Sequence, residues 1–282
     1  MPTAPALALA TETVQFDTGS EPLLVDPSRS LFDAVVDAWI AAGREGSDGQ
    51  ATGTAGTAGT ADPDLPTLSV LARPPVFEAA TDGFHEASRL ADPVEAGVIA
   101  LYTLPRSQPT TVLATHEEGF SVVETDDGRY RVGSDPTLRG RYADTLAAAD
   151  SFSLRTPSRR RIHDAFCDRC GEAVAADVLS LLDAEPDPGE DDLLGARERS
   201  YLAGARHGVL HYELRRAGED AGLGSLSTFS KVKARLMDAD LFTTEKVDQP
   251  VGRPRQQLVA SDALSEAPLA EVLEVVREAL QK

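Results

Sequence analysis

Residues 222–236 of the chain read GLGSLSTFSKVKARL, a glycine-rich turn that leads into an amphipathic segment. Two glycines around Leu223 allow a tight turn with an apolar plug, the feature that lets two helices cross at a steep angle. Ser225 and Ser227 are good N-caps, so we expect a helix over about 225–239. At about 100° per residue, its apolar side chains gather on one side and its hydroxyl and basic side chains on the other.

The segments around this stretch predict helix, short strand, helix, helix and hairpin. The expected elements are helices at about 193–206 and 212–221, a short strand at 209–211 between them, and strands at 241–246 and 257–260 after the third helix. A loop over 247–256 joins the last two strands. This order is that of a winged helix-turn-helix domain, which we place at 193–262.

The expected domain has the geometry for double-stranded DNA as a partner. A helix fits the major groove, and a hairpin reaches the neighbouring backbone or minor groove. The loop contains GRPR at 252–255, and arginine is favoured in narrow minor grooves. Lys233 projects on a different flank from Lys231, and a solvated helix face or surface turn also carries such residues. The candidate DNA-binding residues are Ser225, Ser227, Thr228, Lys231, Lys233, Arg235, Arg253 and Arg255.

Strand and helix patterns alternate before this domain. The expected strands are 68–72, 98–103, 110–114, 120–124 and 130–132, and the expected helices are 30–40, 75–90, 135–149 and 158–184. Alternation of this kind favours an α/β or α+β domain, which we place at 1–184. The polar segment 185–192, EPDPGEDD, is the expected linker.

Two further segments have a distinct composition. Residues 46–64 contain a Gly/Thr/Ala repeat with nothing to bury, which predicts a flexible insertion. Residues 263–282 form an amphipathic segment, expected as a helix that either closes the winged-helix core or pairs with its twin in a dimer.

The composition is strongly acidic and poor in lysine. The chain has 46 acidic and 27 basic residues, a net charge of −19, and only four of the basic residues are lysines. This balance is typical of a salt-in halophile, and it excludes a uniformly basic nucleic-acid coat but not a local basic patch. No segment has the length of a membrane span, and the first residues lack the basic start of a signal peptide. We therefore expect a cytoplasmic protein with no membrane partner.

The one arrangement with metal-binding residue types is His163 with Cys167 and Cys170. It offers at most three ligands, whereas a closed structural zinc site needs four, so it is a weak metal candidate. Sharing across a dimer, a redox switch and ordinary helix packing are the other interpretations. The chain has no phosphate-binding glycine loop and no nucleophile elbow, so we expect no cofactor and no enzymatic activity.

Four runs carry a resemblance to a known family: ARHGVLHYELRR at 205–216, GLGSLSTFSKVKARL at 222–236, EKV at 245–247 and VGRPRQ at 251–256. They resemble the haloarchaeal TbsP-type transcription regulators, two-part proteins with a C-terminal winged helix and a genetic connection to the sugar-responsive regulator TrmB. The resemblance implies sequence-specific promoter binding and control of central carbon and sugar metabolism genes.

On this interpretation the N-terminal domain forms a homodimer and senses a small metabolite, while the winged helix reads the operator. The alternative is an α/β enzyme or small-molecule-binding domain joined to a winged helix that binds other proteins. Basic side chains that lie on one face without acidic neighbours would favour DNA, and basic side chains neutralised by carboxylates would favour the alternative.

Overall fold

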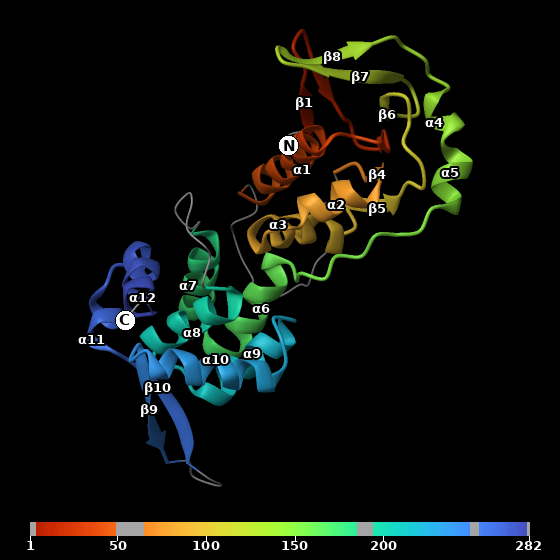
Figure 1. Ribbon diagram of the computed structural model, residues 1–282. Helices are drawn as coiled ribbons and strands as arrows, with labels where there is room; N and C mark the ends of the chain where they lie inside the picture. Colours follow the sequence, from red (N-terminus) through yellow and green to blue (C-terminus); the bar gives the residue numbers. More distant parts are fainter. Residues whose placement is uncertain (1–3, 49–64, 185–193, 249–253, 281–282) are drawn as a thin grey trace. The chain divides into compact units, whose positions relative to one another are not determined.

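The structure is a computed structural model that describes residues 4–48, 65–184, 194–248 and 254–280. The chain forms two compact units, Met1–Arg155 and Thr156–Lys282 (Figure 1). The first is a mixed α/β unit. The second is helical, with a two-stranded hairpin.

A six-stranded sheet forms the centre of the first unit, with the strand order β5-β4-β3-β6-β7-β8. Strands β3, β4 and β5 run parallel to one another, and each neighbouring pair from β3 through β6 and β7 to β8 is antiparallel. Their bounds are β3 Leu23–Val25, β4 Leu68–Ala72, β5 Ile99–Thr103, β6 Thr111–Ala114, β7 Gly119–Thr125 and β8 Gly128–Val132. A separate hairpin pairs β1, Ala6–Ala8, with β2, Thr13–Gln15.

Helices cover both faces of this sheet. Successive side chains of a strand point to opposite faces, so Leu24 joins one apolar core while Leu23 and Val25 join the other. The larger core is covered by three helices: α1 Arg29–Asp48, α2 Pro74–Ala80 and α3 Phe84–Glu95. The smaller core lies under α4, Leu138–Arg141, and α5, Ala143–Ala148. The fully apolar β3 therefore reads as a strand that is buried on both faces.

Two expected helices of the first unit are each divided. The segment expected as one helix over 75–90 forms α2 and α3, because the chain turns at Thr81 and restarts at the N-cap Gly83. The segment expected as one helix over 135–149 forms the short helices α4 and α5. The described helix α1 ends at Asp48, and residues 49–64 of the expected insertion lie outside the described residues.

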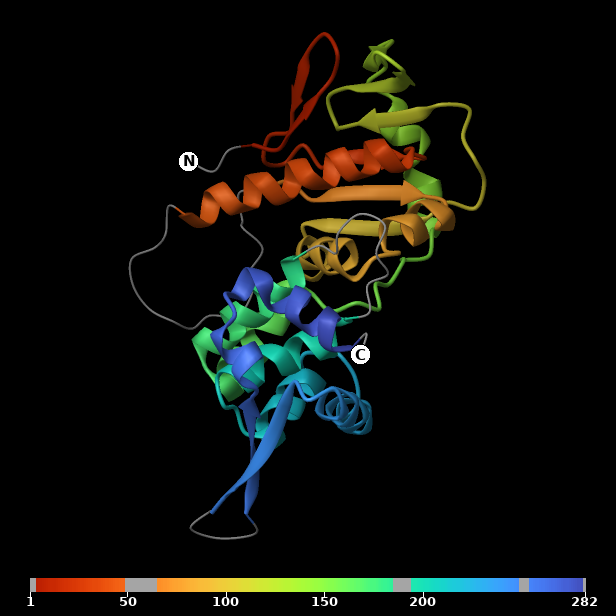
Figure 2. The ribbon, with the colours of Figure 1, turned by 60° about the vertical axis from the view of Figure 1, so that its left-hand side comes forward.

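The second unit contains the helix-turn-helix order expected from the sequence. Its elements are α6 Arg159–Cys170, α7 Glu172–Asp183, α8 Ala196–Arg206, α9 His211–Asp220, α10 Leu226–Asp238, β9 Phe242–Val247, β10 Arg255–Ala260, α11 Asp262–Glu266, the 3-10 turn η1 Leu269–Glu271 and α12 Val272–Leu280. Leu210 bridges to Gln257 as an isolated β-bridge, at the place of the expected short strand. The hairpin of β9 and β10 extends away from the helices of its unit (Figure 2).

The boundary between the units differs from the expected linker at 185–192. Helices α6 and α7 belong to the second unit, because they pack on α8 and α9. The buried guanidinium of Arg199 in α8 also donates to the carbonyl oxygens of Leu181 and Ala184 at the end of α7, at 2.5 and 2.6 Å. A positive φ of 95° at Gly171 divides the single helix that was expected over 158–184. The expected linker, residues 185–192, lies outside the described residues.

The C-terminal segment closes the core of the second unit, which is the first of the two expected alternatives. The side chains of Val272, Leu273 and Val276 are buried. Helix α11 packs on α8 and β10, and η1 packs on α7. The Arg206 guanidinium donates to the carbonyl oxygen of Ala267 at 2.9 Å and also to that of Leu264. No helix among the described residues combines the length and the apolar character that crossing a membrane requires.

Candidate nucleic-acid interface

The side chain of Tyr201 in α8 holds the second unit together. Its ring stacks on Phe242 of β9 at 5.7 Å and packs against Phe229 of α10 at 5.8 Å. Its hydroxyl donates to the Phe229 carbonyl oxygen at 2.8 Å and lies 3.0 Å from Nε2 of His211 in α9. Burial raises the pKa of Tyr201, and burial together with the charges of Lys233 and Arg215 lowers the pKa of His211 to about 4. One side chain thus joins the three helices and the hairpin.

Helices α8, α9 and α10 cross so closely that two crossing points require glycine. A Cβ atom at Gly218 would lie 2.0 Å from Cζ of Phe229, and one at Gly204 would lie 2.3 Å from Cδ1 of Leu214. Gly222 opens the turn at φ +83°, and the plug residue Leu223 is 4% exposed. The sequence prediction of a tight turn with an apolar plug is confirmed.

The start of α10 is defined by its first hydroxyls. Ser225 is the N-cap, and its Oγ accepts from the backbone N–H of Thr228 at 3.3 Å. The same Oγ lies 2.8 Å from Ser227 Oγ and 3.0 Å from Thr228 Oγ1. The hydroxyl groups of Ser225 and Thr228 therefore take part in the hydrogen bonds of the cap. Ser227 lies on the exposed face of the helix.

The exposed face of α10 contains Ser227, Lys231, Ala234 and Asp238, opposite the buried Phe229, Val232 and Leu236. Lys231 makes no ion pair with any residue that the structure describes. Lys233 lies on another flank, as expected, where its Nζ donates to Gln256 Oε1 of the hairpin at 2.6 Å. Burial and the charge of Arg215 lower the pKa of Lys233.

The two other described cations of the candidate set are paired with carboxylates. Arg235 lies 2.7 Å from Glu198 of α8, and Arg255 lies 2.7 Å from Glu213 of α9. Arg255 also begins β10 instead of lying at the hairpin tip. Arg253 lies outside the described residues. Of the candidate cations in the described part of α10 and the hairpin, two therefore lack a carboxylate partner: Lys231, and Lys233, which is hydrogen-bonded to Gln256.

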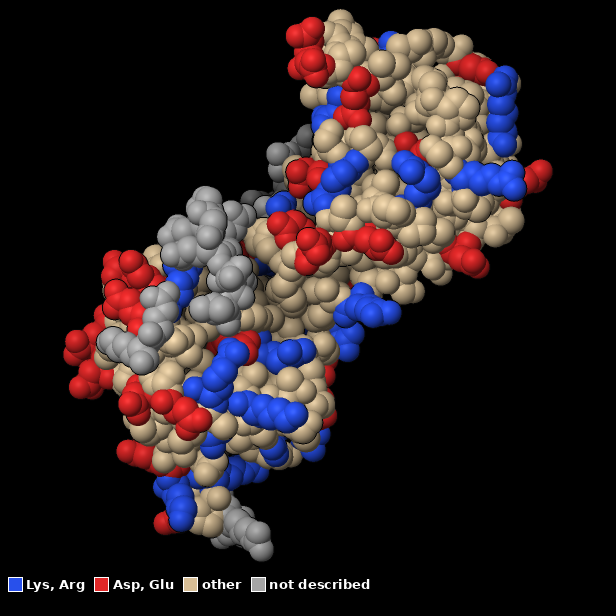
Figure 3. Space-filling model, viewed as in Figure 1, with Lys and Arg blue, Asp and Glu red and all other residues tan. Residues whose placement is uncertain are grey.

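The structure adds residues that the sequence analysis did not select. Tyr212 at the start of α9 is 39% exposed, with the guanidinium carbons of Arg216 and Arg255 at 5.7 and 5.0 Å from its ring centre. The i, i+4 spacing of Tyr212 and Arg216 was a usable signal, whereas Arg255 comes from another element. Figure 3 shows that lysine and arginine gather over the region of α9, α10 and the base of the hairpin, and that acidic side chains gather over α11 and α12.

The cysteine pair forms no metal site in the structure. Cys167 donates to Glu172 at 3.1 Å, and His163 Nε2 lies 3.1 Å from the other oxygen of the same carboxylate. Burial raises the pKa of Cys170 to about 12, and the hydrogen bond to Glu172 raises the pKa of Cys167. Among the described ranges, no three His, Cys, Asp or Glu residues are grouped so as to hold a metal ion.

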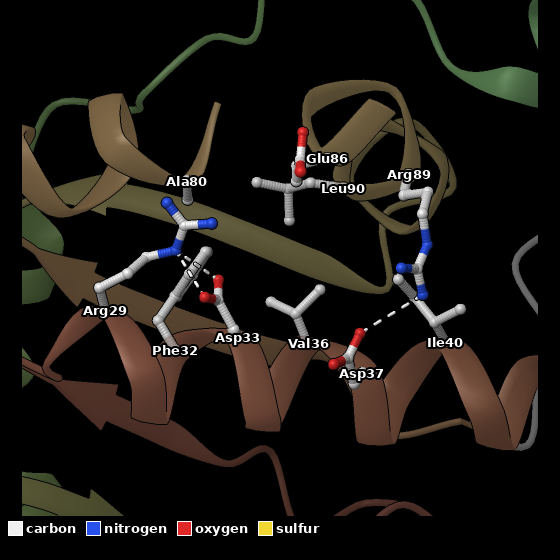
Figure 4. A pocket seen from close by; sticks show the side chains of 10 residues that line it. All are labelled: Arg29, Phe32, Asp33, Val36, Asp37, Ile40, Ala80, Glu86, Arg89 and Leu90. Atoms are coloured by element: carbon white, nitrogen blue, oxygen red, sulfur yellow. Dashed lines mark hydrogen bonds and ion pairs between the residues drawn. The ribbon is translucent and has the colours of Figure 1, made fainter. Parts of the chain in front are cut away.

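The first unit has a half-open groove between α1 and α3, with a volume of about 200 Å³ (Figure 4). Its floor is apolar and includes Phe32, Val36 and Leu90. Two ion pairs lie at its rim: Arg29 with Asp33 at 2.6 Å, and Arg89 with Asp37 at 3.4 Å. The lining thus offers both hydrogen-bond donors and acceptors above an apolar surface.

Three helices packed around Tyr201 and followed by a hairpin define a winged helix-turn-helix domain, here joined to a mixed α/β unit. Residues 158–277 match the family model described as Transcriptional regulator TbsP-like, C-terminal HTH domain, and residues 49–157 match Transcriptional regulator TbsP-like, N-terminal. The chain belongs to the family of TbsP-like transcriptional regulators, and it is a DNA-binding transcription regulator. The two matches meet within two residues of the boundary between the units. No curated protein and no solved structure matches the chain.

Proposed function

We propose that the second unit binds specific promoter sequences in double-stranded DNA, with α10 in the major groove and the hairpin on the backbone or in the minor groove. The observation that carries this proposal is the exposed face of α10, where Ser227 and Lys231 lie opposite an apolar face buried against Tyr201 and its neighbours. We further propose that the regulated genes belong to central carbon and sugar metabolism.

The candidate residues divide by chemistry. Hydroxyls of Ser227 and Thr228 can bond to base edges, and Lys231 can bond to guanine O6 and N7 or to a phosphate. Arg235 and Arg255, with Arg253 beyond the described residues, can bond to phosphates. Ser225 contributes by fixing the start of α10, since its hydroxyl caps the helix. No step of this recognition requires a cofactor.

The test compares promoter occupancy of the wild-type chain with that of Lys231→Ala by chromatin immunoprecipitation. Loss of one specific base or phosphate contact costs about 1–3 kcal/mol, so occupancy should fall about tenfold. Arg106→Ala is the matched control, because this exposed arginine lies in the first unit and its side chain makes no ion pair with a described residue. Equal occupancy for both variants would contradict the proposed role of the α10 face.

We also propose that the chain acts as a homodimer and works at high salt. Molar salt reduces the Debye length to about 3 Å and weakens the gain from counterion release. Two half-sites read by two copies offset this loss, and they would be spaced by about one helical turn, roughly 10 base pairs. Light scattering in molar KCl tests the dimer, and a footprint with one half-site only would contradict it.

The groove between α1 and α3 supports the proposal that the first unit senses a small metabolite. Its mixture of guanidinium and carboxylate groups suits a small ligand with both donors and acceptors, and its apolar floor suits a carbon skeleton. Thermal unfolding of the chain with a panel of central carbon metabolites tests this proposal. A ligand should raise the transition of the wild-type chain but not that of Arg89→Ala.

A second candidate function is favoured by the carboxylates beside Arg235 and Arg255. They neutralise two cations of the set, which suits a winged helix that binds a protein and a first unit that is an enzyme or a small-molecule-binding domain. Failure of the full chain to bind any duplex at low salt would support this function and contradict the proposed roles of α10 and the hairpin.

A further inference from the structure

The two carboxylates that pair with candidate DNA-binding arginines occupy equivalent places in the fold. Glu198 is the third residue of α8, and Glu213 is the third residue of α9. Each therefore lies in the first turn of its helix, where the helix dipole and unpaired backbone N–H groups favour negative charge. Each reaches a separate element, α10 in one case and β10 in the other.

Both pairs place the arginine outward and the carboxylate inward. The side chain of Arg235 is 51% exposed and that of Glu198 is 11% exposed. The side chain of Arg255 is 41% exposed and that of Glu213 is 24% exposed. An arriving phosphate can therefore reach the guanidinium group, while the carboxylate stays within the protein.

The carboxylates keep other stabilising interactions if the arginines turn to DNA. Both carboxylates stay beside the N-terminus of their own helix. Glu213 also keeps its ion pair with Arg169 of α6, at 3.5 Å. The guanidinium group of Arg255 lies over the ring of Tyr212, and this contact orients the arginine side chain. Exchange of the carboxylate for a phosphate is thus available to both arginines, but it releases less free energy than binding by an unpaired arginine.

We propose that Glu198 and Glu213 are specificity-determining residues that limit the affinity of this surface for DNA of arbitrary sequence. This inference rests on the proposed function of the α10 face. The carboxylates cancel the charge of Arg235 and Arg255 in the free protein, so these arginines add little to non-specific binding. They bond fully to phosphates only where base contacts of α10 hold the unit in register.

The test measures binding of the full chain to two labelled duplexes by fluorescence anisotropy across a series of KCl concentrations. One duplex has a random sequence, and the other is selected for tight binding to the wild-type chain. Glu198→Gln and Glu213→Gln keep the shape and the hydrogen-bond acceptor but remove the charge. Each should steepen the slope of log K against log salt by about 0.9. Affinity for the random duplex should rise about tenfold at low salt, and affinity for the selected duplex should rise less.

Glu274→Gln is the matched control, since this exposed glutamate of α12 is in the same unit and carries the same charge. Its slope should equal that of the wild-type chain. Adding Arg235→Gln to Glu198→Gln should remove the gain. Circular dichroism establishes that each variant is folded, and the two separate pairs give independent readings.

The outcomes separate the inference from the function on which it rests. If the wild-type chain binds DNA and both Gln variants keep the slope of Glu274→Gln, the inference is overturned and DNA binding is retained. Weaker binding by the Gln variants would also overturn it. If no variant binds any duplex, the proposed function falls and the inference falls with it.

Discussion

The two units of the chain are stabilised in different ways. In the first unit, apolar side chains fill both faces of a sheet, and the central strand β3 contributes to both cores. In the second unit, helices α8, α9 and α10 cross so closely that glycine is required at Gly204 and Gly218. At these two glycines the crossing leaves no room for an added side-chain atom, and overpacking a well-packed core is destabilising.

Two spectroscopic signals distinguish the units. Trp39 is the chain's single tryptophan and is buried in the first unit, so its fluorescence follows that unit. The second unit holds most of the described helical residues, so circular dichroism at 222 nm follows it more closely.

The largest effect is expected for Gly218→Ala. The new methyl group would lie 2.0–2.6 Å from the ring of Phe229, which is fully buried and cannot move aside. The cost should be about 3 kcal/mol of unfolding free energy, measured by denaturant unfolding followed at 222 nm. Gly140→Ala in α4 is the control, because its Cβ meets nothing within 4 Å. An unchanged transition in Gly218→Ala would show that the crossing of α9 and α10 has room for the added methyl group.

The next effect is expected in the first unit for Asp26→Asn. The buried Asp26 carboxylate accepts from Arg73 Nε at 2.8 Å, Ser107 Oγ at 3.0 Å and the Gln108 N–H at 2.7 Å. Asparagine tolerates the φ of 46° at this position, so the change removes charge without adding backbone strain. The loss should be about 2 kcal/mol in the Trp39 transition. A comparable shift confined to the 222 nm signal would contradict this assignment.

A smaller effect is expected from pH, and it should appear in the second unit. The pKa of His211 is about 4 in the folded chain against 6.5 ordinarily, because burial and the charges of Lys233 and Arg215 disfavour its protonation. The unfolded chain therefore binds a proton that the folded chain does not, and stability falls as pH drops from 6.5 to about 4. After solvent screening the loss should be on the order of 1–2 kcal/mol.

The measurement is denaturant unfolding at 222 nm across this pH range, with His211→Gln as the comparison. The variant should lose the pH dependence in this window. In the first unit, burial opposes the hydrogen bonds of Asp26, but the bonds from Arg73, Gln108 and Ser107 prevail and lower its pKa. The contribution of Asp26 should therefore be lost only below its ordinary value of 3.8. A Trp39 transition that weakens between pH 6.5 and 4 as much as the 222 nm signal would contradict the contrast.

The smallest effect is expected from salt. The first unit has 23 acidic and 10 basic residues, and the second has 23 acidic and 17 basic residues. Screening of like charges should therefore stabilise the first unit more, by on the order of 1 kcal/mol between low and molar KCl. Thermal unfolding followed by both signals checks this difference. Equal gains in the two signals would show that net charge does not distinguish the units.

The sequence predicts the second unit well because its signals are local. The caps, the glycines around Leu223 and the apolar spacing of α10 all act within a few residues, and each has its counterpart in the structure. The division of the helix expected over 158–184 was harder to predict. Gly171 marks the break with a φ of 95°, but a single glycine within an apolar periodic segment is also tolerated inside a helix.

The ion pairs of the candidate site could not be predicted in the same way. The ion pair of Arg235 joins residues 37 positions apart, and that of Arg255 joins residues 42 positions apart. In a chain with so many carboxylates, composition does not tell which one lies beside a given arginine. Only the packing of α8 on α10 and of α9 on β10 brings these charges together.

Tyr201 has a consequence for the shape of any duplex that the protein binds. The buried ring of Tyr201 in α8 contacts α9, α10 and β9. The distance between α10 and the hairpin is therefore held fixed. Under the proposed mode of binding, it is the DNA that must bend or narrow to fit this fixed spacing. Flexible base steps between the two contact points would then be selected although no side chain touches them.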